Sequence, residues 1–133
     1  MTRFVSRLLM VTGVGHALVG VALFSEPLGE MVREGFFGTI WYGQWDRAAA
    51  FWFLLFSPIC VLLGQMVAHA RARDDRWLLT VIGWNLLATS LVGVVIMPLS
   101  GFWILLAIAP LVFHLARTVR IGSVALAGGV ERS

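Results

Sequence analysis

An all-α membrane protein with four spanning helices is the fold class that this sequence predicts. Of its 133 residues 59% are hydrophobic and only 13% are charged, whereas about a quarter of the residues in a soluble domain carry a charge. Four apolar segments each approach the roughly 20 residues that a helix needs to cross a bilayer. Backbone groups cannot stay unpaired in lipid, and the sequence has no ten-residue alternating strands, so the spanning elements are expected to be helices.

The first apolar segment follows two arginines and superficially resembles a signal peptide. It has no convincing small-residue cleavage site before Ser25, so it is predicted to be a retained first span. The first and fourth spans are short, which snorkelling arginines or local bilayer thinning would accommodate. One domain covering 1–133 is expected, with spans at about 8–24, 48–70, 77–97 and 101–116 and a C-terminal tail at 117–133.

The long connection between the first two spans is predicted to contain a short interfacial helix. Ser25 can cap it, and Pro27 suits the first turn of a helix, which would continue to about Glu34. Met31 and Val32 would then rest on the membrane surface.

The arginines predict the orientation in the membrane. All ten basic residues are Arg, which is typical of a GC-rich bacterium, and only Arg33 and Arg47 would lie on the outer side. The positive-inside rule therefore places both termini in the cytoplasm and the protein in the bacterial cytoplasmic membrane. Because the arginines form no basic stripe, nucleic acid is not an expected partner. The arginines expected on the inner side are Arg3, Arg7, Arg71, Arg73, Arg76, Arg117, Arg120 and Arg132.

Polar residues in the middle of the first and third spans form the first candidate site. His16 and Asn85 each lie nine residues beyond the nearest flanking arginine, which places both about 13 Å deep at helical rise. Thr12 precedes His16 by four residues, and Thr89 follows Asn85 by four, so each pair shares a helix face. The pattern predicts either a polar clamp between the two spans or a midplane site that protonates or orients a ligand.

The outer mouth of the second span forms the second candidate site, where Trp41, Tyr42, Asp46 and Arg47 follow one another closely. Trp41 and Tyr42 fit an interfacial aromatic belt, and Asp46 is expected to cap the start of the span. Arg47 either snorkels or turns inward to hold an anionic head group or a carboxylate. The candidate carboxylates are Glu26, Glu30 and Glu34.

Two histidines near the inner interface form the third candidate site. His69 and His114 lie at equal depth on different spans and are either interfacial side chains or axial haem ligands. The lone Cys60 is expected to be buried and inert. The sequence has no metal-binding, phosphate-binding or nucleophile motif, and no cofactor is expected. No carboxylate lies inside a span, which argues against a small proton exchanger.

Three short segments carry a family resemblance: Gly13 to His16 with Gly20, the run from Tyr42 to Phe53, and Gly101 to Trp103. They resemble an uncharacterised group of small bacterial four-span membrane proteins. The number and order of the helices also resemble the broader DoxX-like class. The resemblance implies a four-helix bundle and no particular activity, because a fold does not define a function.

The sequence favours a membrane protein that binds an apolar ligand, such as a lipid, a quinone or an isoprenoid, or that supports a membrane partner. That partner is another membrane protein or a second copy of the chain. The alternative is an enzyme that isomerises or cyclises an isoprenoid-like substrate. His16 would then act as acid and base, Asn85 would orient it, and Asp46 with Arg47 would hold a polar head. A haem electron carrier using the two interfacial histidines is the third hypothesis.

Overall fold

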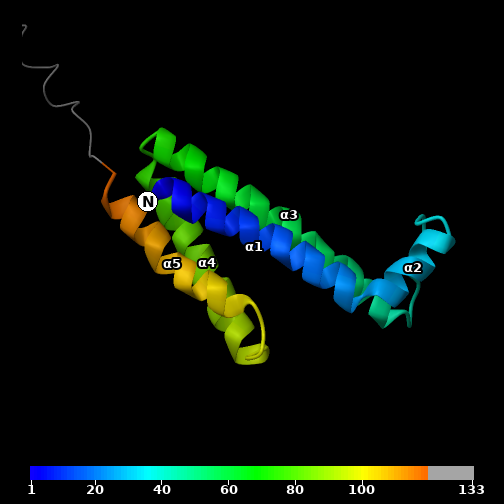
Figure 1. The fold of residues 1–133 in the computed structure, drawn as a ribbon. Coiled ribbons are helices and arrows are strands. Elements are labelled where there is room, and N and C mark those ends of the chain that lie inside the picture. Colours follow the sequence, from blue (N-terminus) through cyan, green and yellow to red (C-terminus); the bar gives the residue numbers. More distant parts are fainter. Residues whose placement is uncertain (120–133) are drawn as a thin grey trace, which may run out of the picture.

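The computed structural model describes residues 1–119, which form two antiparallel helix pairs and one short helix (Figure 1). The all-α prediction is confirmed for these residues. The predicted tail beyond residue 119, with Arg120 and Arg132, lies outside the described part of the chain. The helices are α1 (Thr2–Leu23), α2 (Ser25–Arg33), α3 (Trp45–Ala72), α4 (Arg76–Ile96) and α5 (Phe102–Arg117).

Three of the helices, α1, α3 and α4, are long and apolar enough to cross a membrane. The fourth predicted span, α5, is an apolar helix of only 16 residues. At helical rise α5 is about 24 Å long, whereas the 28 residues of α3 extend for about 42 Å. The longest helix, α3, therefore exceeds α5 by twelve residues, whereas α1 and α4, with 22 and 21 residues, are nearly equal in length.

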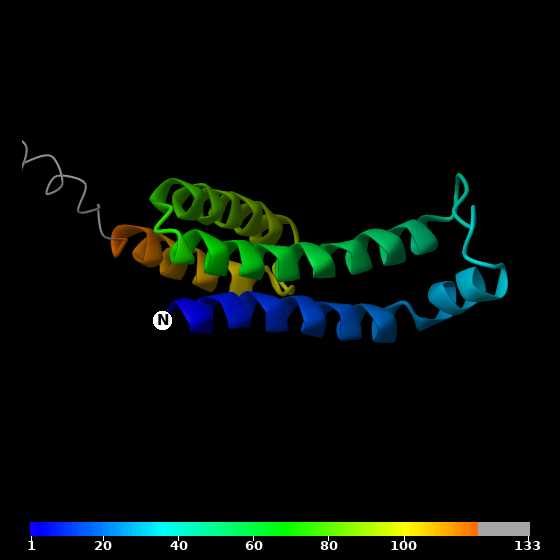
Figure 2. The same cartoon turned by 90° about the horizontal axis from the view of Figure 1, so that it is seen from above.

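The helices pair as α1 with α3 and α4 with α5, and Figure 2 shows α1 and α3 side by side along their lengths. The α4–α5 pair lies beside only the end of α1 and α3 that carries the N-terminus. Phe102 at the start of α5 reaches Phe56 in the middle of α3, with ring centroids 6.0 Å apart. No Cα atoms of α1 and α4 come within 8 Å of each other. The four helices therefore depart from a regular bundle in which all run together.

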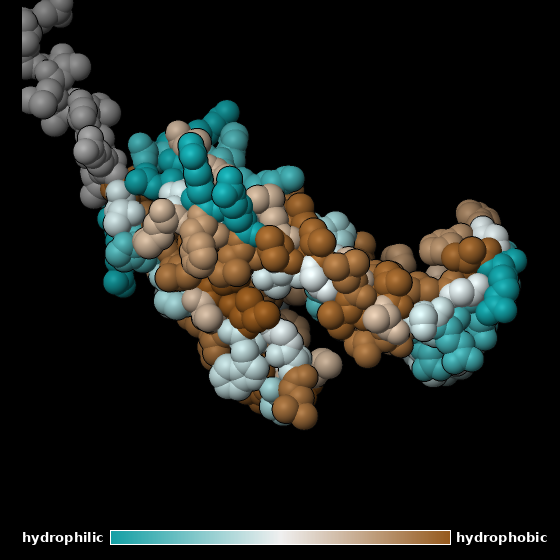
Figure 3. All heavy atoms as spheres, in the orientation of Figure 1, coloured by the Kyte–Doolittle hydropathy of each residue, from teal (hydrophilic) through white to brown (hydrophobic). Residues whose placement is uncertain are grey.

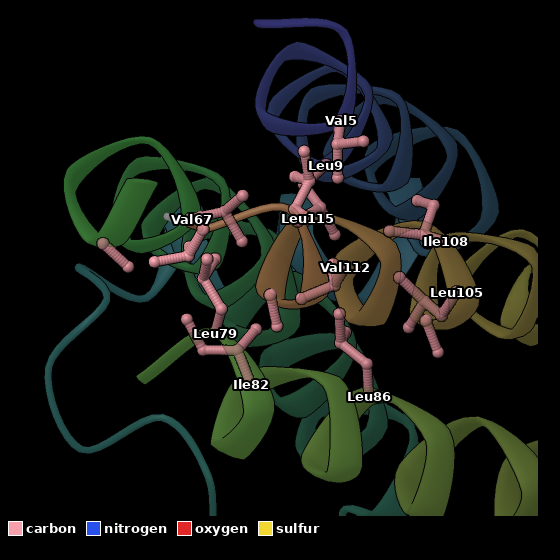
Figure 4. Close-up of a cluster of buried hydrophobic side chains, with 14 residues drawn as sticks. Val5, Leu9, Val67, Leu79, Ile82, Leu86, Leu105, Ile108, Val112 and Leu115 are labelled. Carbon is pink, nitrogen blue, oxygen red and sulfur yellow. The ribbon is translucent and has the colours of Figure 1, made fainter. Parts of the chain in front are cut away.

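The shared core occupies the end of the molecule where all four long helices meet (Figure 4). Its side chains are aliphatic and fully or almost fully buried. Away from this core, α1 and α3 pack only on each other and on α2. The core residues labelled in Figure 4 are Val5, Leu9, Val67, Leu79, Ile82, Leu86, Leu105, Ile108, Val112 and Leu115.

The short helix α2 lies where the sequence predicts it, but two details differ. Ser25 is the first helical residue, and its side chain makes no capping hydrogen bond. Met31 is buried against the protein and does not rest on a membrane surface, whereas Val32 is exposed. The helix is therefore held by contacts with α1 and α3, which an amphipathic pattern alone cannot distinguish from contacts with lipid.

The surface in Figure 3 divides into two polar ends and an apolar middle. One polar end surrounds α2, and the other lies near the N-terminus and the α3–α4 turn. The apolar middle includes strongly exposed side chains such as Leu18, Trp52 and Val92. A surface of this kind would be costly in water and is the expected one for helices surrounded by hydrocarbon.

Candidate functional site

Arg47, in the first turn of α3, anchors α2 to the rest of the molecule. Its guanidinium donates hydrogen bonds to both carboxylate oxygens of Glu34, at 2.6 and 2.7 Å, and to Glu30 at 3.0 Å. It also donates to the backbone oxygen of Thr39 at 2.8 Å. Only 9% of the Arg47 side chain is exposed. Of the roles considered from the sequence, Arg47 therefore has the one in which it turns inward and holds carboxylates.

The contact with Arg47 changes the pKa of Glu34. The hydrogen bond from Arg47 lowers the pKa of Glu34 below its ordinary value of 4.5, and this effect outweighs the opposing effect of desolvation. The carboxylate therefore stays charged at neutral and mildly acidic pH, so the ion pair between α2 and α3 persists there.

A pocket of about 410 Å³ opens beside this ion pair, between α2 and the start of α3. Asp46 lines it but does not cap α3, because Gln44 occupies the capping position and no side chain accepts a capping hydrogen bond. The predicted cap at Asp46 is therefore wrong, and its carboxylate is exposed. We call this cavity the α2 pocket; it is lined by Glu26, Pro27, Glu30, Gly43, Gln44, Asp46 and Arg47.

Aromatic side chains surround the connection that leads to the α2 pocket. Trp41, Tyr42 and Trp45 are all strongly exposed, and the rings of Tyr42 and Trp45 meet edge to face at 5.8 Å. The backbone turns tightly here: the side-chain oxygen of Gln44 accepts a hydrogen bond from the backbone nitrogen of Trp41, and Gly43 adopts a φ of 94°. The predicted outer mouth thus combines exposed aromatic rings with an acidic pocket.

The predicted pairing of His16 with Asn85 is wrong. His16 stacks on Phe53 of α3, with ring centroids 3.9 Å apart, and meets the ring of Phe56 edge to face. The Asn85 side chain donates to the backbone oxygen of Val81 in its own helix and is exposed. His16 therefore packs in the contact between α1 and α3, whereas Asn85 faces outward from α4, and the two residues belong to different surfaces.

The error has a geometric cause. A spacing of four residues shows which side chains share a helix face, but not which helix that face meets. The packed face of α4 carries Leu79, Ile82, Leu86 and Ser90, all buried, and Asn85 lies about 100° around the helix from Leu86. Thr89 is likewise exposed. On α1, Thr12 donates to the backbone oxygen of Leu8 in its own helix.

The two interfacial histidines, His69 and His114, lie near the C-terminal ends of α3 and α5, and both are exposed. Within residues 1–119, no group of three or more His, Cys, Asp or Glu side chains is placed to hold a metal ion. Cys60 is fully buried as a free thiol, as predicted.

A second cavity, of about 400 Å³, lies between the start of α1 and the end of α3 and was not predicted from the sequence. Arg3 and Arg7 from α1 and Arg71 from α3 line it. The spacing of Arg3 and Arg7 by four residues places them on one helix face. That spacing was a usable signal, but the sequence does not show that Arg71 joins them.

Three helices long and apolar enough to cross a membrane, together with the two polar ends, define the class of the protein as a small, multi-helix membrane protein. Within that class, the chain belongs to the family described as "Family of unknown function (DUF6463)", whose model matches residues 1–119. Neither the curated proteins nor the solved structures contain a match to the chain.

Proposed function

We propose that the protein crosses a bacterial cytoplasmic membrane four times, in a DoxX-like order, with the N-terminus and the end of α5 in the cytoplasm. The distribution of charge supports this orientation. One end carries Arg3, Arg7 and the arginines of the α3–α4 turn, and the other carries Glu26, Glu30 and Glu34. The short α5 would cross the membrane by local thinning or by snorkelling of Arg117.

The orientation is testable by single-cysteine labelling in a Cys60→Ala background. A membrane-impermeant maleimide should label Tyr42→Cys in intact cells and Arg73→Cys only after lysis. Labelling of Arg73→Cys in intact cells would overturn the proposed topology.

We further propose that the protein supports a membrane partner, and that the outward face of α4 binds a transmembrane helix of that partner. The observation that carries this proposal is the exposure of Asn85 and Thr89 in the middle of a helix long enough to span a membrane. The amide NH₂ of Asn85 donates one hydrogen bond to the backbone oxygen of Val81. Its second N–H and its side-chain oxygen need partners from another helix.

The energetics favour a helix as the occupant of this face. An amide that faces hydrocarbon leaves hydrogen-bonding capacity unused, which is costly in lipid. A partner helix with an amide or hydroxyl side chain at the same depth would satisfy it, and interhelical hydrogen bonds of this kind contribute about 1 kcal/mol. Ala88 lies on the same exposed surface, and its small side chain would allow close approach.

The test is thiol cross-linking in isolated native membranes, again in the Cys60→Ala background. Ala88→Cys should cross-link to a partner, and Leu18→Cys, which is exposed at a similar depth on α1, is the matched control. Adding Asn85→Leu should lower the yield of the cross-linked product about fivefold, as expected when association loses about 1 kcal/mol of free energy.

The product identifies the partner by mass: twice the chain mass indicates a second copy, and any other mass indicates a different protein. Equal cross-linking at positions 88 and 18, or a product unaffected by Asn85→Leu, would overturn the proposed α4 interface.

The α2 pocket supports a second candidate function, the binding of an amphiphilic ligand. Glu26, Glu30 and Asp46 line the pocket, and the positive charge of Arg47 is already engaged by two carboxylates. The pocket therefore suits a head group with an ammonium or hydroxyl donor. Its apolar tail would lie along the outer parts of α1 and α3, which α4 and α5 leave uncovered.

Mass spectrometry of lipids and metabolites that co-purify with the protein tests this second function. The variant Glu26→Gln/Asp46→Asn should lose a bound amphiphile that wild type retains. His16→Ala, which lies outside the pocket, is the control and should retain it. An identical profile for wild type and the double variant would rule out a ligand in the α2 pocket.

The enzyme hypothesis requires His16 and Asn85 in one site, and these residues are separated, so we propose no catalytic role for the pair. The haem hypothesis with His69 and His114 remains a prediction that a Soret band in the purified protein would test. Among the described residues, His69 and His114 make no contact with each other that would favour the haem hypothesis over partner binding.

A further inference from the structure

The cavity between the start of α1 and the end of α3 combines a basic rim with an apolar floor. We call it the Arg groove. Arg3, Arg7 and Arg71 line it together with the apolar side chains of Met10 and Ala68. It lies at the end of the molecule opposite the α2 pocket, so it is independent of the two proposed binding functions and rests only on the proposed membrane crossing.

The two α1 arginines have no carboxylate partner within the described part of the chain. The ion pairs there involve Arg47 and Arg71 only. Arg71 pairs with Asp74, and its guanidinium also donates to the backbone oxygen of Thr118 at the end of α5, at 3.4 Å. Three guanidinium groups from two helices thus border one cavity, and two of them are available to an anion.

The apolar floor distinguishes this cavity from a site for a free anion. Met10 lies one turn beyond Arg7 toward the middle of α1, and Ala68 lies one turn before Arg71 toward the middle of α3. Both apolar residues are therefore about 5 Å deeper in the membrane than the arginines, at helical rise. A phosphate followed by methylene groups matches this change from charged to apolar with depth.

The close approach of α1 and α3 builds the groove rigidly. The Ser6 hydroxyl, which also lines the groove, donates to the backbone oxygen of Gly64 at 2.7 Å. Gly64 has no side chain to separate the helices, since a Cβ there would lie 2.7 Å from the backbone oxygen of Ser6. The backbone positions that carry the arginines on the two helices are therefore held at a fixed spacing.

From these observations we infer that the Arg groove binds the phosphate of an anionic phospholipid, with Arg3 and Arg7 contacting the phosphate and the first methylenes of the lipid resting on Met10 and Ala68. Basic pockets between membrane helices are suited to such head groups. Arginine is the appropriate residue because its planar guanidinium binds phosphate oxygens in pairs.

Native mass spectrometry of the full chain in detergent, titrated with phosphatidylglycerol, tests this inference. Arg3→Gln/Arg7→Gln should bind the lipid about 10- to 30-fold more weakly, at about 1 kcal/mol for each arginine. Arg73→Gln/Arg76→Gln removes the same charge from the same end of the molecule but leaves the groove intact, and should bind like wild type. Phosphatidylcholine, which has a phosphate but no net charge, should bind weakly to all three proteins.

A steric variant separates the groove from charge alone. Ala68→Trp keeps every arginine and fills the floor, and it should also weaken binding at least tenfold. Because Ala68 is exposed in the groove, the variant should elute as wild type does in size-exclusion chromatography. If Ala68→Trp binds normally, or if both arginine pairs weaken binding equally, the groove is not the lipid site.

Inorganic phosphate distinguishes the two sources of this anion. Addition of millimolar phosphate should leave phosphatidylglycerol bound, because the free ion gains nothing from the apolar floor. Displacement of the lipid by phosphate, or binding of phosphate without retention of the lipid, would assign the groove to a free anion and overturn the inference.

Discussion

The two helix pairs both place glycine at their contacts, but they use it in different ways. In the α1–α3 pair, two of the contact glycines face backbone: a Cβ at Gly13 would lie 2.6 Å from the carbonyl oxygen of Ser57, and one at Gly64 would lie 2.7 Å from that of Ser6. Only Gly20, at the far end of α1, faces side chains there. In the α4–α5 pair, glycine faces an aromatic ring: a Cβ at Gly83 would lie 2.9 Å from the ring of Phe113. The first pair is thus joined by close backbone approach, and the second by a ring packed on a flat helix surface.

This difference determines how each pair should respond to added volume. A backbone carbonyl moves only if the whole helix moves, and α3 is fixed by contacts along its length. A phenylalanine ring can change its tilt within one residue. We therefore expect α1 and α3 to form the rigid half of the molecule, whereas α4 and α5 tolerate substitution at their contact.

The largest expected effect is that of Gly13→Ala. The added methyl group forces α1 away from Ser57, and overpacking of this kind costs about 2 kcal/mol of unfolding free energy. Unfolding by SDS in mixed micelles, followed by circular dichroism, measures the loss. Gly15→Ala is the control on the same helix, because a Cβ at Gly15 meets nothing within 4 Å; its stability should equal or slightly exceed that of wild type. Similar losses for the two variants would contradict the close-approach interpretation.

Gly83→Ala should lower the free energy of unfolding by less, about 1 kcal/mol, because the ring of Phe113 can move aside. The double variant Gly83→Ala/Phe113→Leu makes room for the new methyl group. Its loss should be about 1 kcal/mol less than the sum of the two single losses. The matching cycle of Gly13→Ala with Ser57→Ala should be additive, since the contact at Gly13 is with the Ser57 backbone. Additive losses at Gly83 would remove the proposed difference between the pairs.

Much of this fold was predictable from the sequence because hydrophobic length is a one-dimensional property. Runs of apolar residues located the four long helices, and the Ser25 to Pro27 segment located α2. The pairing of the helices was not predictable. It depends on which faces meet in space, and apolar side chains on every face of α1 and α4 leave that choice open.

The candidate sites show the same limit. Counting from the flanking arginines gives an expected depth for His16 and Asn85, but depth does not give a neighbour, and the structure places them on separate surfaces. Arg47 was more predictable: an arginine beside a short acidic helix has few alternatives to binding its carboxylates. The Arg groove depends on α1 meeting α3, so it became visible only with the helix pairing.

A smaller effect is expected at the serines that each pair buries. Ser6 donates across the α1–α3 contact to Gly64, whereas Ser90 donates within α4 to the backbone oxygen of Leu87 at 3.0 Å. Ser6→Ala should lower the free energy of unfolding by about 0.6 kcal/mol, the average for an interhelical hydrogen bond in a membrane protein. Ser90→Ala should lie within about 0.5 kcal/mol of wild type. The same SDS unfolding measurement compares them, and a larger loss for Ser90→Ala would contradict the assignment of the rigid contact to α1 and α3.

The smallest expected effect on the whole fold concerns α2, which an ion pair to α3 holds in addition to the burial of Met31. Because Arg47 lowers the pKa of Glu34 below 4.5 in the folded protein, the ion pair stabilises the docking of α2 at all higher pH values. That contribution is lost as the pH falls through the lowered pKa.

A carbon-13 NMR titration of the Glu34 carboxyl in micelles checks this directly. In wild type its midpoint should lie below 4.5, and in Arg47→Gln it should rise toward 4.5 because the main hydrogen-bond donor is gone. Hydrogen exchange of residues 25–44 should quicken in Arg47→Gln at neutral pH, while exchange in the shared core stays unchanged. An unchanged Glu34 midpoint in the variant would show that Arg47 does not hold the carboxylate, and α2 would then depend on the burial of Met31 for its position.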